Sequence, residues 1–190
     1  MYHPSVRLVL ASRSPRRSEL LSCAGYEFSV APADVDETIQ PGEVAETYVQ
    51  RMAKDKVARV AGNYPGAVIL GADTVVVVDG DILGKPLYDE AAGMLRRLSG
   101  RTHDVLTGVV LTMGGRWCSE VASTRVTFRD LTATDIAWYL DSGESAGKAG
   151  AYAIQGRASR FVTRIDGSYS NVVGLPVAVV DRLLREIWID

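Results

Sequence analysis

The stretch VRLVLASRSPRRSELL, Val6 to Leu21, passes from an apolar run to a helix start within a few residues. The run that ends at Leu10 predicts a short buried strand. Ser14 suits the N-cap of a helix, and Pro15 suits the first helical position, where a backbone N–H would have no partner. Strand and helix patterns alternate in the same way along the rest of the chain. This alternation predicts an α/β or α+β sheet fold.

Arg16 and Arg17 fall in the first turn of that helix. The N-terminus of a helix already carries about half a positive charge, so cations there are unfavourable by about a few tenths of a kcal/mol. An anion held between the helix N–H groups and the two guanidinium groups would resolve this conflict. Phosphate fits best. The alternative is a pair of solvated arginines on a surface helix.

Composition points to an ordinary globular protein. The chain has 190 residues, with 47% hydrophobic and 23% charged residues, and these values favour a single domain over residues 1–190. The net charge of -2 argues against a general nucleic-acid binder. Two separate cysteines, Cys23 and Cys118, indicate a reducing compartment. No apolar stretch is long enough to span a membrane, and the first residues do not resemble a signal peptide. We therefore expect a cytoplasmic protein.

The elements can be placed from periodicity and from turn residues. We expect strands over residues 26–30, 67–72, 75–78, 82–83, 105–113 and 117–128, and a strand and turn over 161–169. We expect helices over residues 43–61, 89–99 and 132–142, and one that begins at Pro176. Asp79-Gly80 and Gly114-Gly115 are hairpin signals. Residues 144–156, rich in glycine and alanine, predict a loop.

Asp73 is the first candidate for chemistry, because it directly follows the apolar strand pattern of residues 67–72. Folds of this class place reactive groups at strand ends. Its small neighbours Gly71 and Ala72 leave room for a substrate. The alternative is a turn aspartate or a helix cap, but no helix signal follows Asp73. We therefore expect a functional role.

Other charged groups could complete such a site. The acidic loop Asp34, Asp36 and Glu37 could supply a ligand to Mg²⁺, which needs only one or two carboxylates beside water and phosphate oxygens. Most acidic loops, however, are merely solvated. Lys56 shares the spacing of the apolar stripe of its helix, so it projects inward or extends from the edge of the stripe to solvent. Lys85 lies between Gly84 and Pro86 as a second fixed cation.

Six segments in order resemble the Maf family of nucleoside triphosphate pyrophosphatases. They are ASRSPRRSELL, RMAKDKVA, GADTVV, GKP, KAGAYAIQG and GSYSNVVGLP, and they span nearly the whole chain. The resemblance implies a mixed α/β fold, with an elongated central sheet and flanking helices forming two lobes around a cleft. It is an architecture similar to that of inosine triphosphate pyrophosphatases. It also implies hydrolysis of a nucleoside triphosphate to the monophosphate and pyrophosphate.

The resemblance also implies roles for individual residues. Asp73 would be the proton acceptor, and Arg16, Thr74 and Gln155 would discriminate between substrates. As a hypothesis of our own, we expect five residues to bind phosphate, namely Ser12, Arg16, Arg17, Lys56 and Lys85. The resemblance implies a divalent cation, and we expect Mg²⁺ or Mn²⁺ to bind with help from Glu37, Asp36 or Asp73. The family suggests a homodimer, and we expect no nucleic-acid or membrane partner.

The segment KAGAYAIQG, residues 148–156, resembles the branch of the family that hydrolyses dTTP and UTP. Ala153 replaces the usual glycine, and Gln155 stays in register. An amide can donate to a carbonyl of thymine or uracil and accept from the ring N3–H. Two alternatives remain. One is the branch that prefers 7-methyl-GTP, which has a glutamate-containing segment here, and the other is a nucleotide-binding regulator of cell division without turnover.

Overall fold

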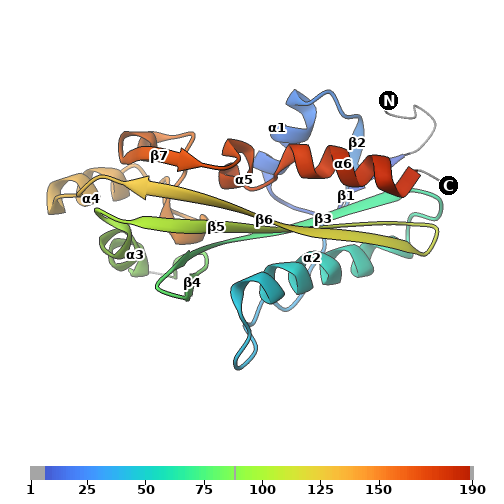
Figure 1. Ribbon diagram of the computed structural model, residues 1–190, viewed down its shortest axis with the longest axis horizontal. Coiled ribbons are helices and arrows are strands. Elements are labelled where there is room, and N and C mark those ends of the chain that lie inside the picture. Colours follow the sequence, from blue (N-terminus) through green and yellow to red (C-terminus); the bar gives the residue numbers. More distant parts are fainter. Residues whose placement is uncertain (1–6, 88, 189–190) are drawn as a thin grey trace. The chain divides into compact units, whose positions relative to one another are not determined.

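The computed structural model describes residues 7–87 and 89–188. Within them, seven strands form one mixed sheet in the order β2-β1-β3-β5-β6-β7, with β4 paired to β3 (Figure 1). The strands are β1 (Leu8–Leu10), β2 (Phe28–Val30), β3 (Val68–Val78), β4 (Asp81–Leu83), β5 (Thr102–Met113), β6 (Arg116–Phe128) and β7 (Val162–Asp166). The helices are α1 (Pro15–Cys23), α2 (Ala45–Ala61), α3 (Glu90–Leu98), α4 (Ala133–Leu140), α5 (Tyr169–Val173) and α6 (Val177–Trp188). The predicted mixed α/β fold is confirmed.

The chain divides into two compact units. Of the residues that are described, unit 1 contains 7–73, 107–122 and 174–188, and unit 2 contains 74–87, 89–106 and 123–173. Strands β3, β5 and β6 contribute residues to both. The single domain expected over residues 1–190 stays a prediction.

Unit 1 is a sheet covered on both faces. Strand β1 pairs in parallel with β2 and with β3, so that Leu10 lies beside Val30 and Leu70. Alternate strand residues face opposite sides. One side packs against α1 and α6 through Leu8, Leu10, Leu21, Leu70, Leu183 and Leu184, and the other packs against α2 through Val9, Ala53, Val57, Val60 and Ile69. Figure 1 shows α2 and α6 on opposite sides of these strands.

Two glycines bring the backbone of α2 against the sheet of unit 1. A Cβ atom at Gly71 would lie 2.5 Å from the carbonyl oxygen of Ala53, and one at Gly108 would lie 2.4 Å from the carbonyl oxygen of Val49. Real Cβ atoms do not approach backbone this closely, so only glycine fits at these positions. The helix therefore contacts the strands with its main chain at two points one turn apart.

Unit 2 carries the predicted turn and cap signals. Asp79 and Gly80 both have positive φ, as a type I′ hairpin requires, and they join β3 to β4. Thr132 and Asp135 form the predicted capping box of α4. The core includes an aromatic cluster in which Phe128 contacts His103, Tyr152 and Phe161 edge to face.

The structure corrects several element boundaries. Strand β3 does not end before Asp73: it runs on to Val78, so Asp73 and Thr74 lie inside a strand. Backbone pairing with β4 holds the end of β3, residues 76–78, in the strand, and the predicted break is wrong. Residues 169–173 form the short helix α5, which the strand-and-turn prediction did not include. The predicted loop of residues 144–156 contains a short 3-10 helix, Ala149–Ala151, and a second one, Arg157–Arg160, begins directly after it.

Candidate functional site

A cluster of three charged side chains, Lys56, Asp73 and Glu37, forms the charged centre of unit 1. The ammonium nitrogen Nζ of Lys56 lies 2.5 Å from Oδ1 of Asp73 and 2.9 Å from Oε1 of Glu37. The side chains of Lys56 and Asp73 are 9% and 12% exposed, whereas that of Glu37 is 41% exposed. Two carboxylates thus meet one buried ammonium group, and Glu37 is the most exposed of the three side chains.

Helix α2 places Lys56 at this point. Tyr48, Val49, Met52 and Val60 lie on the buried face of the helix, and Lys56 lies among them because it follows Met52 by one turn. The predicted inward orientation of Lys56 is confirmed, and Lys54 is exposed as expected. A lysine on an apolar stripe needs a partner, and Asp73 on β3 supplies it.

Arg17 is a second buried cation of unit 1, and it donates hydrogen bonds to backbone and side-chain oxygens of the protein. Its Nε donates to the carbonyl oxygen of Gly174 at 2.8 Å, and its Nη1 donates to the carbonyl oxygen of Ala72 at 2.8 Å and to Oγ of Ser12 at 3.2 Å. Burial lowers the pKa of Arg17, and the charge of Asp73 opposes that shift. Arg17 therefore fixes the backbone just before Asp73. The neighbouring Arg16 is half-buried.

Ser12 and Ser14 shape the turn before α1. Ser14 is the N-cap residue as predicted, but its side chain makes no capping hydrogen bond. Its backbone N–H instead donates to Oγ of Ser12 at 3.2 Å. Ser12 is buried and also accepts from Arg17, so the hydroxyl group joins the turn to the guanidinium group.

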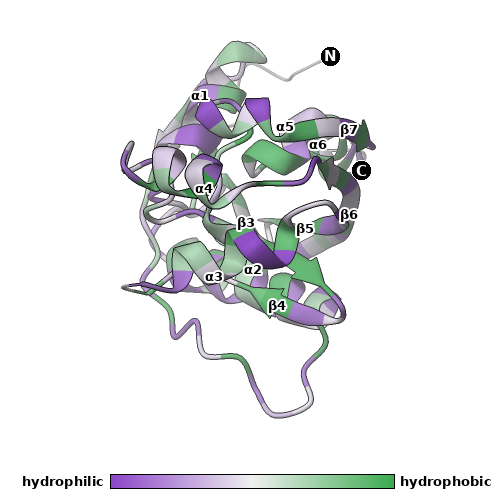
Figure 2. Cartoon of the chain, turned by 90° about the vertical axis from the view of Figure 1, so that its left-hand side faces the viewer, coloured by the Kyte–Doolittle hydropathy of each residue, from purple (hydrophilic) through white to green (hydrophobic). Residues whose placement is uncertain are grey.

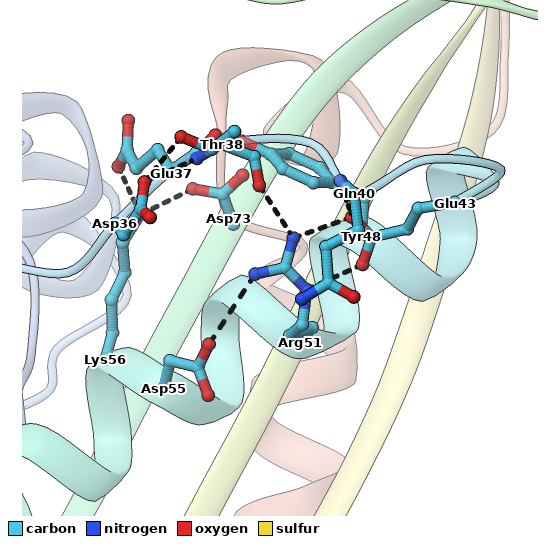
Figure 3. A network of polar contacts seen from close by, with 10 residues as sticks. All are labelled: Asp36, Glu37, Thr38, Gln40, Glu43, Tyr48, Arg51, Asp55, Lys56 and Asp73. Carbon is cyan, nitrogen blue, oxygen red and sulfur yellow. Dashed lines mark hydrogen bonds and ion pairs between the residues drawn. The ribbon is translucent and has the colours of Figure 1, made fainter.

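The loop of residues 36–43 is tied to α2 by polar contacts. Figure 2 shows an extended loop that is mostly hydrophilic or near neutral in colour, in agreement with the sequence DETIQPGE of residues 36–43. Arg51 of α2 binds both carboxylate oxygens of Glu43 at 2.6 Å and the carbonyl oxygen of Thr38 at 3.0 Å. The hydroxyl group of Tyr48 donates to the carbonyl oxygen of Glu37 at 3.0 Å (Figure 3).

These contacts and the burial of Tyr48 shift the pKa values of Glu43, Tyr48 and Asp36. The hydrogen bond from Arg51 lowers the pKa of Glu43 to about 2. Burial, reinforced by the charges of Asp73 and Glu37, raises the pKa of Tyr48 to about 12, so its hydroxyl group keeps its proton. Hydrogen bonds from the side chain and backbone of Thr38 lower the pKa of Asp36.

The two acidic candidates for a metal differ in their contacts. Asp36 Oδ1 accepts from the hydroxyl group of Thr38 at 2.6 Å and from its N–H at 3.0 Å, so this carboxylate closes its own turn. Glu37 meets the ammonium group that also binds Asp73. No group of three or more His, Cys, Asp or Glu side chains that could hold a metal occurs among residues 7–87 and 89–188. Glu37 and Asp73 nevertheless fit Mg²⁺ or Mn²⁺, since two carboxylates suffice when phosphate and water complete the shell.

Unit 2 contains the remaining predicted site residues. Thr74 is half-buried in β3, whereas Lys85 and Gln155 are exposed. Gln155 is flanked by fixed backbone. Ala153 N donates to the hydroxyl group of Tyr139 at 3.0 Å, and Arg157 N donates to Glu144 Oε2 at 2.8 Å.

The segment that includes Gln155 also packs closely at its start. Gly150 N donates to the carbonyl oxygen of Gly84, next to Lys85, at 3.1 Å. A Cβ atom at Gly150 would lie 2.8 Å from Cγ2 of Val76. The KAGAYAIQG and GKP segments therefore lie side by side within unit 2.

Sequence reasoning missed Tyr48, Arg51 and Glu43. The spacing of Tyr48 fits the apolar stripe of α2, and its ring is buried there, but its hydroxyl group also binds the loop. Arg51 lies outside the inward spacing, and its partner Glu43 is eight residues away, so no helical pattern links them. The one available signal was Pro41-Gly42, which turns the loop back toward the helix.

No helix among the described residues is long and apolar enough to cross a membrane. The structure of the Staphylococcus aureus Ham1 protein matches the chain with a TM-score of 0.54 at 12% identity, covering 95% of this chain and 98% of that one. That likeness confirms the fold alone.

Sequence relatives share a much higher identity with the chain. A dTTP/UTP pyrophosphatase of Hahella chejuensis is 52% identical over 192 residues, which cover 97% of this chain and 96% of the relative. One of Myxococcus xanthus is 53% identical over 179 residues, which cover 94% and 91%. The model of the Maf-like protein family matches residues 7–187. The chain is therefore a member of the Maf family.

Proposed function

We propose that this protein hydrolyses nucleoside triphosphates, with dTTP and UTP preferred, to the monophosphate and pyrophosphate. The names of relatives about half identical over nearly the whole chain support the reaction and the pyrimidine preference. The observation that carries the proposal is the convergence of Asp73 and Glu37 on the buried ammonium group of Lys56. Such an arrangement suits a reaction whose barrier falls by positioning and charge neutralisation.

In the proposed reaction, Asp73 accepts a proton from a water molecule. The water oxygen bonds to the α-phosphorus, and the bond from the α-phosphorus to the oxygen that bridges to the β-phosphorus breaks. Pyrophosphate leaves with that oxygen. Lys56 and Lys85, with Arg16 and Arg17, offset charge on the triphosphate. Ser12 supports the turn before α1 by accepting a hydrogen bond from the backbone N–H of Ser14.

A divalent cation bound by Glu37 and Asp73 would neutralise phosphate charge and polarise phosphoryl oxygens. Asp36 is the weaker candidate ligand, because its carboxylate already accepts two hydrogen bonds from Thr38. The assignment of Mg²⁺ or Mn²⁺ belongs to this proposal and follows from the oxygen-only donor set.

Base selection is assigned to Gln155, with Arg16 and Thr74. An amide at Gln155 can pair with both the carbonyl and the N3–H of uracil or thymine, whereas cytosine reverses part of that pattern. The hydrogen bonds at Ala153 and Arg157 restrict the backbone on either side of Gln155, which supports a specific contact.

The setting proposed for the enzyme follows from its charge and family. We infer a cytoplasmic homodimer whose partner is the nucleotide substrate rather than nucleic acid or a membrane. The net charge of -2 supports the exclusion of nucleic acid.

The decisive test is pyrophosphate release from a panel of nucleoside triphosphates with Mg²⁺ or Mn²⁺. We expect the highest kcat/KM for dTTP and UTP, and no release after chelation of the metal. A preference for 7-methyl-GTP would overturn the pyrimidine assignment. Nucleotide binding without pyrophosphate release would instead indicate a regulator of cell division.

A further inference from the structure

The loop of residues 36–43 brings Glu37 to Lys56 with little apolar anchoring of its own. Residues 36–42 are all exposed, and Ile39, the large apolar side chain among them, is 44% exposed. The loop is not part of the strand pairing of unit 1. Its position therefore depends on polar contacts with α2.

Arg51 makes most of those contacts. Its planar guanidinium group binds both oxygens of Glu43, a two-point geometry that an ammonium group cannot reproduce. Nη2 of Arg51, which donates to Oε2 of Glu43, also donates to the carbonyl oxygen of Thr38. Glu43 Oε2 in turn accepts from the backbone N–H of Gln40 at 3.0 Å. Arg51 thus holds the loop at Thr38 directly and at Gln40 through Glu43 (Figure 3).

Tyr48 holds the backbone of the loop at Glu37. Its hydroxyl group binds the carbonyl oxygen of Glu37, the residue before Thr38. The ring of Tyr48 is buried, and the guanidinium group of Arg51 lies 5.5 Å from its centroid, so the two side chains support each other.

The three contact points on α2 follow the helix repeat. Arg51 lies three residues after Tyr48, and Lys56 lies eight residues after Tyr48, so both lie on the side of the helix centred on Tyr48, within about a quarter turn of it in opposite directions. The loop crosses that side with Thr38 at Arg51 and Glu37 at both Tyr48 and Lys56. A rigid helix therefore determines where the carboxylate of Glu37 lies.

From this geometry we propose that Arg51 is a positioning residue that acts through Glu37. It holds the loop of residues 36–43 so that the Glu37 carboxylate stays beside Lys56 and Asp73, where the proposed function requires it as a ligand of the divalent cation. The inference rests on that proposed function for its kinetic consequence, but the positioning itself is independent of it.

The first test needs no activity. Hydrogen exchange of the metal-free protein is compared for wild type, Arg51→Gln, Arg51→Lys and Tyr48→Phe, with Arg59→Gln as the matched control because Arg59 is an exposed arginine of the same helix. We expect exchange in residues 37–43 to rise about tenfold or more in both Arg51 variants and to stay unchanged in the control. Tyr48→Phe should give a smaller rise centred on residues 37 and 38. Unchanged exchange in the Arg51 variants would overturn the proposal.

The second test separates positioning from general damage. We expect Arg51→Gln to raise the Mg²⁺ concentration for half-maximal pyrophosphate release about tenfold, the lower end of the effect of losing a group that orients a metal ligand. In a Glu37→Gln background, Arg51→Gln should add no further change. Additive effects in the double variant would mean that Arg51 does not act through Glu37.

The two proposals fail differently. Absence of pyrophosphate release by the wild-type protein would overturn the proposed function, whatever the exchange result. An active wild type with an unchanged Mg²⁺ requirement in Arg51→Gln would overturn the positioning role and leave the proposed function intact. Tyr48→Phe keeps the test decisive should Arg51→Gln fail to fold, since it removes a single hydroxyl group of α2 that binds the same loop.

Discussion

Units 1 and 2 hold their candidate site residues in opposite ways. In unit 1, Arg17, Lys56 and Asp73 are buried, and each side chain is bound to fixed protein partners. In unit 2, Lys85 and Gln155 are exposed, and the backbone around them is what is fixed. A buried charge that loses its partner is costly, whereas an exposed side chain contributes little to folding. Substitutions in unit 1 should therefore affect stability and turnover together, and those in unit 2 turnover or selectivity alone.

The largest effect is expected at Asp73. Asp73→Asn keeps an oxygen that can accept from Lys56 but removes the proton acceptor, so kcat should fall about 100- to 1,000-fold. Pyrophosphate release and circular dichroism measure turnover and folding, and Asp141→Asn, at an exposed position of unit 2, is the control. Near-normal turnover would remove Asp73 from the role of base.

Arg17 and Lys85 test whether a charged side chain of unit 1 contributes more to the free energy of unfolding than one of unit 2. Arg17→Met leaves the carbonyl oxygens of Ala72 and Gly174 without this donor, and we expect the free energy of unfolding to fall by about 3 kcal/mol. Lys85→Met in unit 2 should change it by less than about 0.5 kcal/mol, because the side chain is exposed. Urea denaturation of both variants measures the difference, and equal losses would break the contrast between the units.

His103 shows where unit 2 does bury a titratable group. It lies 2.9 Å from the hydroxyl group of Tyr152 and against Phe128, and burial lowers its pKa from 6.5 to about 4. The unfolded chain therefore binds a proton that the folded protein excludes. Stability should fall by about 3 kcal/mol as the pH drops from 6.5 to 4.

The measurement compares urea denaturation at neutral and acidic pH for wild type and His103→Gln. The variant should lose less stability than the wild type on acidification, because its amide does not titrate. Parallel pH profiles for the two proteins would show that His103 does not contribute to this loss.

The smallest effect is expected at Gln155. Gln155→Ala should reduce the ratio of kcat/KM for dTTP over CTP about tenfold, the effect of about one lost hydrogen bond, and should leave the urea midpoint unchanged. A lowered midpoint would place Gln155 among the structural residues and blur the distinction between the units.

Periodic patterns in the sequence predicted the parts of the fold that local rules determine. The stripe of α2 predicted the inward Lys56, and the spacing of Thr132 and Asp135 predicted the capping box. The hairpin at Asp79-Gly80 followed from the backbone preference of those two residues. In each case the interacting groups are close in sequence.

What the sequence could not predict depends on distant partners. The expected role of Arg17 in phosphate binding stays a prediction, whereas its buried hydrogen bond to a carbonyl oxygen 157 residues away has no signal in the sequence. Asp73 was placed after a strand because polar residues usually end apolar runs, yet Lys56 across the unit stabilises it within β3. Arg51 and Glu43 are eight positions apart, and Glu43 precedes the helix, so no periodic pattern predicts their contact.

Gly71 and Gly108 have a consequence for how this site can change over evolution. Because α2 meets the sheet of unit 1 through its own main chain at Ala53 and Val49, the height of the helix above the strands is set by backbone thickness. Core side chains around it can be exchanged while Tyr48, Arg51 and Lys56 keep their height. A methyl group at either glycine would push α2 away from the sheet and move Tyr48, Arg51 and Lys56 together. The two glycines therefore determine the distance between these side chains and the strands.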